Sequence, residues 1–119
     1  MRAARAEIDL GAIAHNTRVL AELARPAALC AVVKADGYGH GAVPVSRVAL
    51  QAGATWLAVA LVEEAAVLRS AGIDAPVLLL SQLPARDMAE ALRWGVRITV
   101  YTSEGVRAAA AAARAAGTL

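Results

Sequence analysis

Four short apolar segments recur along this chain at a spacing that few folds can use. They end at Val33, Ala60, Leu80 and Tyr101, so successive ends are 27, 20 and 21 residues apart. The stretches between them carry apolar residues at helical spacing and are bounded by proline or glycine. Strands and helices that alternate at this interval predict a parallel sheet with right-handed crossovers. The spacing fits a barrel and an open doubly wound sheet equally well.

Capping and stop residues set the boundaries of the expected elements. Asp9 is placed to cap a first helix and Pro26 stops it, while Glu63 and Glu64 suit the positive end of a helix dipole. The strand before Lys34 continues a longer apolar run, so we expect it to be buried on both faces. The expected helices cover 10–24, 43–52, 63–72, 84–95 and 103–117, and the expected strands cover 29–33, 56–60, 77–80 and 97–101.

The stretch AVVKADGYGHG, residues 31–41, is the strongest candidate for a functional site, because it places an amine, a phenol and an imidazole among glycines. Its Lys34 is the single lysine among 12 basic residues, and it stands at the end of the first expected strand. The glycines that follow allow a sharp turn and close approach of the backbone to another group. A neutral lysine amine can form a Schiff base with a carbonyl cofactor or substrate. The alternative is an ordinary lysine whose ammonium reaches water.

Three motifs resemble one enzyme family, in the same order. The string VVKADGYGHG is similar to the cofactor-lysine motif of alanine racemases, and EIDLGAIAHN and LAVALVEEAAVLRSAGIDAPVLLL resemble the same family. The resemblance implies an α/β fold, a (β/α)8 TIM-type barrel of which this chain covers about the first four βα units. It also implies that residues 1–119 are the N-terminal portion of the barrel domain that binds pyridoxal phosphate, with no second domain in this chain.

The same resemblance assigns roles to individual residues. Lys34 matches the catalytic lysine that holds pyridoxal 5'-phosphate as a Schiff base and then acts as an acid or base. Tyr38 matches a tyrosine that reaches the cofactor phosphate, and Leu80 matches a leucine near the cofactor. Ser81 follows Leu80 where the family more often has glycine, which weakens that transfer. His40 is expected to fix the loop rather than to act in catalysis.

The implied activity is interconversion of L- and D-alanine, which supplies D-alanine for peptidoglycan. The family works as a homodimer, in which the second catalytic base, a tyrosine, comes from another domain of the partner subunit. We therefore expect this chain alone to be inactive. The alternatives are a racemase of broader specificity, a non-enzymatic module that binds pyridoxal phosphate, and a half-barrel that assembles with something else. A related amino-acid decarboxylase is disfavoured, since its lysine is not normally followed by a YGHG run.

Composition narrows the possible partners and the compartment. A scattered net charge of +2 without basic clusters argues against nucleic acid, and no apolar run approaches the ~20 residues that a membrane span requires. No metal site is expected. The single Cys30 reads as a buried, inert thiol, and no secretory signal precedes it. We therefore expect a cytoplasmic protein.

Overall fold

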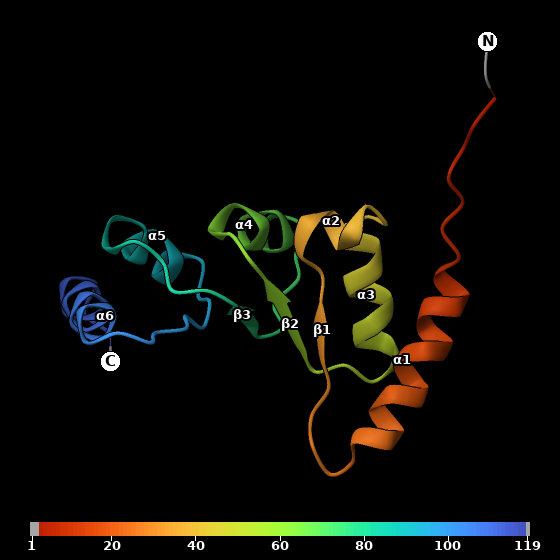
Figure 1. The fold of residues 1–119 in the computed structure, drawn as a ribbon, viewed down its shortest axis with the longest axis horizontal. Coiled ribbons are helices and arrows are strands. Elements are labelled where there is room, and N and C mark those ends of the chain that lie inside the picture. Colours follow the sequence, from red (N-terminus) through yellow and green to blue (C-terminus); the bar gives the residue numbers. More distant parts are fainter. Residues whose placement is uncertain (1–2, 119) are drawn as a thin grey trace.

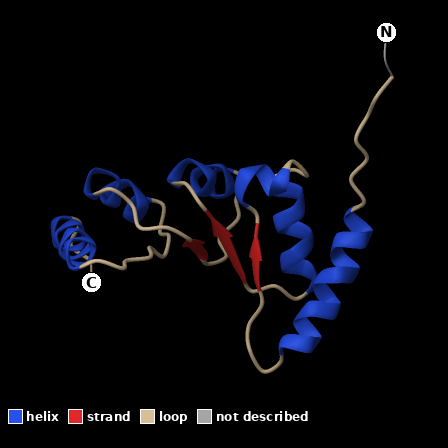
Figure 2. Ribbon diagram, viewed as in Figure 1, coloured by secondary structure: helices blue, strands red, loops and turns tan. Residues whose placement is uncertain are grey.

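The computed structural model describes residues 3–118 and has an α/β architecture (Figures 1 and 2). A small parallel sheet lies at the centre, and helices form an arc along one side of it. The elements in chain order are α1 (Leu10–Ala24), β1 (Cys30–Val32), α2 (Lys34–Tyr38), α3 (Ala42–Ala52), β2 (Trp56–Val59), α4 (Val62–Ser70), β3 (Val77–Leu79), a 3-10 turn η1 (Ala85–Asp87), α5 (Met88–Arg93) and α6 (Ser103–Ala115).

The expected order of strands and helices is confirmed for the first three units. The sheet order is β1-β2-β3 with every pairing parallel, and the register joins Cys30 to Trp56 and Leu57 to Val77. Helix α1 has the predicted bounds, and its N-terminus is closed by Asp9, whose carboxylate accepts from the Ala12 N–H at 3.0 Å.

The expected fourth strand is wrong in extent. The segment after α5 pairs with β3 at a single residue, Arg97, whose N–H and carbonyl bond the Val77 carbonyl and the Leu79 N–H, each at 2.8 Å. Four residues later the Tyr101 N–H donates to the Gln82 side chain instead of to a strand. Before that point, the Leu79 carbonyl, which would accept the next ladder bond from the Thr99 N–H, accepts from the Thr99 hydroxyl at 2.7 Å, so the ladder stops after Arg97.

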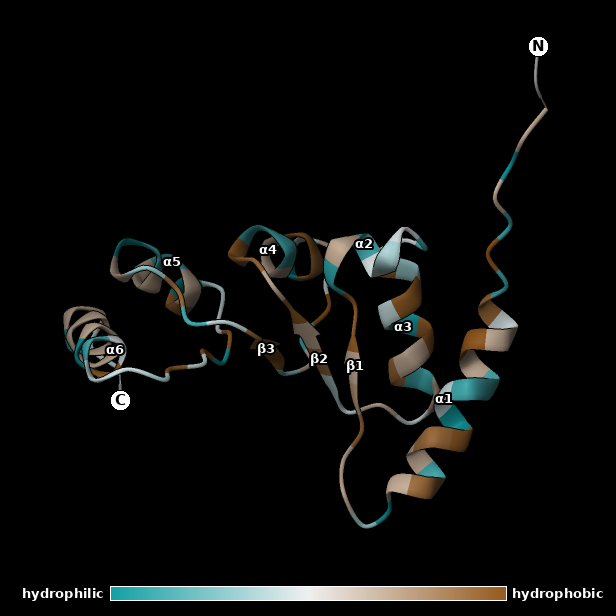
Figure 3. Cartoon of the chain, in the orientation of Figure 1, coloured by the Kyte–Doolittle hydropathy of each residue, from teal (hydrophilic) through white to brown (hydrophobic). Residues whose placement is uncertain are grey.

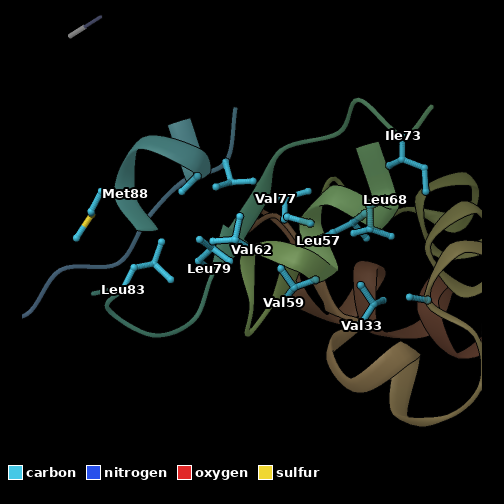
Figure 4. Packing of buried hydrophobic residues seen from close by; sticks show 14 residues of the cluster. Val33, Leu57, Val59, Val62, Leu68, Ile73, Val77, Leu79, Leu83 and Met88 are labelled. Atoms are coloured by element: carbon cyan, nitrogen blue, oxygen red, sulfur yellow. The ribbon is translucent and has the colours of Figure 1, made fainter. Parts of the chain in front are cut away.

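Aliphatic side chains between the sheet and the helices form the core. The register places Leu57 and Val77 on the same face, and both are fully buried. Figure 4 shows the labelled core side chains as a continuous band that runs from Val33 at the end of β1 to Met88 in α5. Fully burying one such leucine or valine stabilises the fold by about 1.5–3 kcal/mol.

The opposite face of the sheet has no covering layer among residues 3–118. Along β1 the burial alternates, with Val33 1% exposed and its neighbour Val32 40% exposed. The expectation that this strand is buried on both faces is therefore wrong, because β1 is an edge strand with helices on one side only. Cys30 is exposed for the same reason, against expectation. Figure 3 shows that these strands are nonetheless apolar. We name the residues of this side the open face: Cys30, Val32, Trp56, Ala58, Leu78 and Leu80. Ala58, in the central strand, is itself fully buried, so the exposure of this face lies along the outer strands.

The molecule is more extended than a closed domain. Its radius of gyration is 16.2 Å, against about 13.5 Å for a compact domain of this length. Part of the excess is the extended segment before α1, and part is the fan of units that ends at α6 (Figure 1). Among residues 3–118, no helix is both long and apolar enough to cross a bilayer.

Candidate functional site

Lys34 lies at the carboxyl edge of the sheet, directly after β1. The N–H of the preceding residue, Val33, still donates to the Ala58 carbonyl at 2.9 Å, so the strand ladder holds the backbone up to the lysine. Lys34 itself is half-buried. No carboxylate of residues 3–118 forms a salt bridge with its ammonium. The amine is thus held near a rigid strand end and is not committed to an ion pair.

The residues after Lys34, assigned as α2, form a left-handed turn. Ala35, Asp36 and Gly37 have φ values of 51°, 53° and 63°, and Tyr38 follows at 57°. A left-handed conformation costs roughly 1–2 kcal/mol at each non-glycine residue, because Cβ approaches the following carbonyl. The surrounding contacts must therefore stabilise this turn.

Asp36 fastens the turn to the next helix. Its Oδ1 accepts from the N–H of Ala42, the first residue of α3, at 2.8 Å, and its carbonyl accepts from the Gly41 N–H at 2.8 Å. A short polar side chain that bonds locally is the type that best tolerates left-handed backbone. Gly37 adds a bond from its N–H to the Val33 carbonyl at 2.9 Å.

Glu64 joins the turn to the neighbouring unit. This residue lies in the first turn of α4, and its Oε1 accepts from the N–H groups of Ala60 and Leu61, each at 2.9 Å. Its Oε2 accepts from the N–H of Ala35, the residue after the lysine. One carboxylate therefore connects the loop after β1 to the loop after β2.

Tyr38 and His40 differ in how they are held. Tyr38 ends the left-handed turn with 58% of its surface exposed. The Nδ1 of His40 lies 3.1 Å from the carbonyl oxygens of both Gly37 and Tyr38. Since carbonyls only accept, this bonding requires Nδ1 to carry a proton. The ring of His40 thereby braces the loop on which Tyr38 sits.

Leu80 lies at the same edge, two strands away from Lys34. Its N–H donates to the Val59 carbonyl at 2.9 Å, and its side chain, 39% exposed, belongs to the open face. Beyond it, the Gln82 side chain accepts from the N–H groups of Tyr101 and Thr102, at 2.9 and 3.1 Å. This second tie joins the loop after β3 to the segment before α6. A cleft lined by residues 60–63 and 81–84 separates the two tied pairs of loops.

Sequence reasoning missed the roles of Asp36, Glu64 and Gln82. For Glu64 a signal was present, since an acid three residues after a helix start has the spacing of a capping box. Its second bond, to Ala35, crosses between βα units and leaves no local pattern. The carboxylates and imidazoles of residues 3–118 form no cluster that could hold a metal ion.

Comparison with known proteins identifies the family. The family model for the alanine racemase N-terminal domain matches residues 8–118. The alanine racemase of Beutenbergia cavernae is 51% identical over 114 residues, which are 96% of this chain and 30% of that protein.

Solved structures agree. Alanine racemase from Streptomyces coelicolor matches with a TM-score of 0.87 and 44% identity, over 95% of this chain and 30% of that one. Alanine racemase from Bacillus anthracis, solved with bound L-Ala-P, matches with a TM-score of 0.80 and 46% identity, over 84% of this chain and 26% of that one. The chain thus spans about 30% of the length of these relatives. The likeness decides between the two architectures that the spacing left open, in favour of the first units of the barrel. This chain therefore belongs to the alanine racemase family, and its residues 8–118 match the family's N-terminal domain.

Proposed function

We propose that this chain is the lysine-bearing part of a pyridoxal-phosphate-dependent alanine racemase. One observation carries the proposal: Lys34 lies at the carboxyl edge of a parallel sheet, at the start of a left-handed turn, and within residues 3–118 it has no salt-bridge partner. Ligands of barrels and of open α/β sheets bind at this edge. Backbone strain also collects at functional sites.

The residues at this edge fit the cofactor. Lys34 offers an amine that pairs with no carboxylate of the described residues, and Tyr38 offers an exposed phenol that can donate to a phosphate oxygen. Leu80 offers apolar surface on the open face for an aromatic ring. We assign Lys34 to the covalent link with the cofactor carbonyl, Tyr38 to the phosphate and Leu80 to the ring.

Lys34 has two tasks in this proposal. Its Nζ would hold the cofactor covalently and, when not so engaged, would take or return the proton at the α-carbon of the substrate. When bound, pyridoxal phosphate supplies the ring into which the electrons of that carbon spread as the proton leaves. Reprotonation from the opposite face needs a second group, and neither Tyr38 nor Tyr101 matches the tyrosine that serves there in the family.

The remaining expectations belong to the same proposal. Residues 1–119 form the N-terminal portion of the barrel domain, and the complete enzyme works as a homodimer on alanine. We place it in the cytoplasm, because its single cysteine cannot form a disulfide within the chain and a free thiol is typical of a reducing compartment.

A chimaeric enzyme tests the function. Residues 8–118 replace the matching stretch of the Beutenbergia cavernae relative, and the protein is incubated with pyridoxal phosphate and reduced with borohydride. We expect the pyridoxyl group on the peptide that contains Lys34, together with formation of D-alanine from L-alanine.

The other outcomes are equally informative. Labelling of Lys34 without racemisation of any amino acid would favour a binding module, and racemisation of several amino acids would favour a broader racemase. If no pyridoxyl group were found on Lys34 in a folded chimaera, the proposed function would be wrong.

A further inference from the structure

We propose that Glu64 is a positioning residue for Lys34 and acts through the backbone of Ala35. This inference rests on the proposed function, because it assigns Lys34 the reactive amine. It concerns a side chain that lies 30 positions further along the chain, in the next βα unit.

The carboxylate of Glu64 has two separate duties. Its Oε1 accepts from Ala60 and Leu61 at the start of α4, which caps that helix. Its Oε2 accepts from the Ala35 N–H, which belongs to the preceding unit. A helix cap needs only the first duty. The second bond is therefore unexplained by the stability of α4.

The bond to Ala35 falls at the point that orients the lysine. The peptide that joins Lys34 to Ala35 is where the chain leaves β1 and enters the left-handed turn. Ala35 adopts a left-handed φ of 51°, and its methyl side chain cannot form a hydrogen bond that would stabilise this conformation. A hydrogen bond to a charged carboxylate is stronger than one between neutral groups, so this contact helps to hold the strained backbone of Ala35. On the other side of Lys34, the Val33 carbonyl accepts from the Gly37 N–H at 2.9 Å. Both peptide planes that flank the Lys34 Cα are therefore held, and together they set the direction of its Cα–Cβ bond.

The chemistry of the contact allows the two duties to be separated. In Glu64→Gln the amide oxygen can still cap α4, but the amide NH2 then faces the Ala35 N–H, so that donor meets donor. In Glu64→Ala both duties are lost. Glu63→Gln is a matched control, since Glu63 is the exposed neighbouring residue and the charge change is the same.

The test uses the chimaera with the thermal midpoint, the rate at which borohydride fixes the pyridoxyl group on Lys34, and hydrogen exchange in the peptide that contains Ala35 as three readouts, and with the steady-state kinetics of alanine racemisation as a fourth. For Glu64→Gln we expect faster exchange at Ala35, slower labelling by about tenfold or more, and a similar loss in kcat at unchanged KM for alanine. The thermal midpoint should stay close to that of Glu63→Gln, which should behave as the parent in all four readouts. Glu64→Ala should lose labelling and also lower the midpoint.

The outcomes separate this inference from the function on which it rests. If the parent labels at Lys34 and Glu64→Gln labels at the same rate, Glu64 is a helix cap only and the positioning role is wrong. If the parent chimaera does not label at Lys34 at all, the proposed function fails and the positioning role fails with it.

Discussion

Lys34 combines an ammonium that pairs with no acid of the part of the chain described by the structure with a backbone fixed on both sides, by the β1 ladder before it and by the left-handed turn after it. Reactions of a bound group gain from such placement, because a misplacement of about 1 Å can cost a hundredfold in rate. The lysine is half-buried and makes no salt bridge within residues 3–118, so it contributes little to the stability of the fold.

Substitution of Lys34 should therefore separate activity from stability. In the chimaera, Lys34→Ala should change the free energy of unfolding by no more than about 0.5 kcal/mol and should lower kcat for alanine by at least about a hundredfold. Lys34→Arg keeps the charge and most of the stem but not the amine, so it should be equally inactive. Racemase assays and urea unfolding measure both quantities. Normal activity in Lys34→Arg would refute the role of the amine.

Cys30 provides a probe of the open face. Partial burial raises the pKa of its thiol above the ordinary value, so less thiolate is present at neutral pH than in free cysteine. We expect slow alkylation by iodoacetamide at pH 7 in the 119-residue chain, with the rate rising as the pH rises through 9. In the chimaera the remaining barrel should cover Cys30 and block the reaction. Equal labelling in both proteins would mean that the open face stays uncovered.

At the scale of residues, the sequence predicts positions better than contacts. The cap of Asp9 and the place of Lys34 at a strand end were both predictable, because each depends on a few neighbouring residues. The burial of Cys30 was predicted wrongly, since it depends on which layers cover the sheet. The bond from Glu64 to Ala35 was not predicted either, because it joins two βα units and depends on how they pack against each other.

The left-handed turn is the element that most sets this site apart. It contains three non-glycine residues at positive φ, and the Oδ1 of Asp36 anchors it to the first N–H of α3. No helical or strand periodicity foretells such a turn, although glycines at 37, 39 and 41 mark where the chain must bend.

Asp36 can be tested for its share in this turn. Asp36→Ala removes the acceptor for the Ala42 N–H and leaves a residue less suited to positive φ, so the chimaera should lose about 1–2 kcal/mol of unfolding free energy. Asp36→Asn keeps an oxygen acceptor and tolerates the same backbone, so its loss should stay within about 0.5 kcal/mol. Urea unfolding of both variants measures the difference. If Asn were as costly as Ala, the negative charge and not the hydrogen bond would hold the turn.

The segment over 97–101 shows the limit of prediction at this scale. Its apolar and β-branched residues suit a strand, yet it pairs only at Arg97 and carries Tyr101 70% exposed. A strand needs neighbours as well as propensity, and this segment has β3 on one side and no strand beyond it within residues 3–118.

At the scale of the whole molecule, residues 3–118 provide no layer over one apolar side of the sheet, and within them β1 has an unpaired edge and β3 pairs beyond β2 only at Arg97. Val32 and Leu80 are 40% and 39% exposed there. Exposed apolar faces and open strand edges promote association. The (β/α)8 architecture was predictable from strand spacing together with family motifs, but which set of side chains would be uncovered was not, because the register decides it.

The 119-residue chain alone should accordingly not behave as a stable monomer. We expect it to pair with a second copy, to aggregate, or to fold only within a longer polypeptide. Sedimentation velocity combined with a thermal melt measures this, and the chimaera, which supplies the missing strands, is the control. A monodisperse monomer that melts cooperatively would contradict the expectation.

The side-chain hydrogen bonds between loops determine which βα units are joined to each other, and at which edge of the sheet. At the carboxyl edge Glu64 clamps the first unit to the second, and Gln82 clamps the third to the segment after it, while a cleft lies between the clamped pairs. At the amino edge the guanidinium of Arg69 spans that same boundary, donating to the carbonyls of Ile73 and Ala75, each at 2.8 Å, and of Trp94 at 2.9 Å. The second and third units are thus tied by Arg69 where the strands begin and separated by a cleft where the strands end. We therefore expect any movement between these two units to be larger at the carboxyl edge, where Lys34 lies.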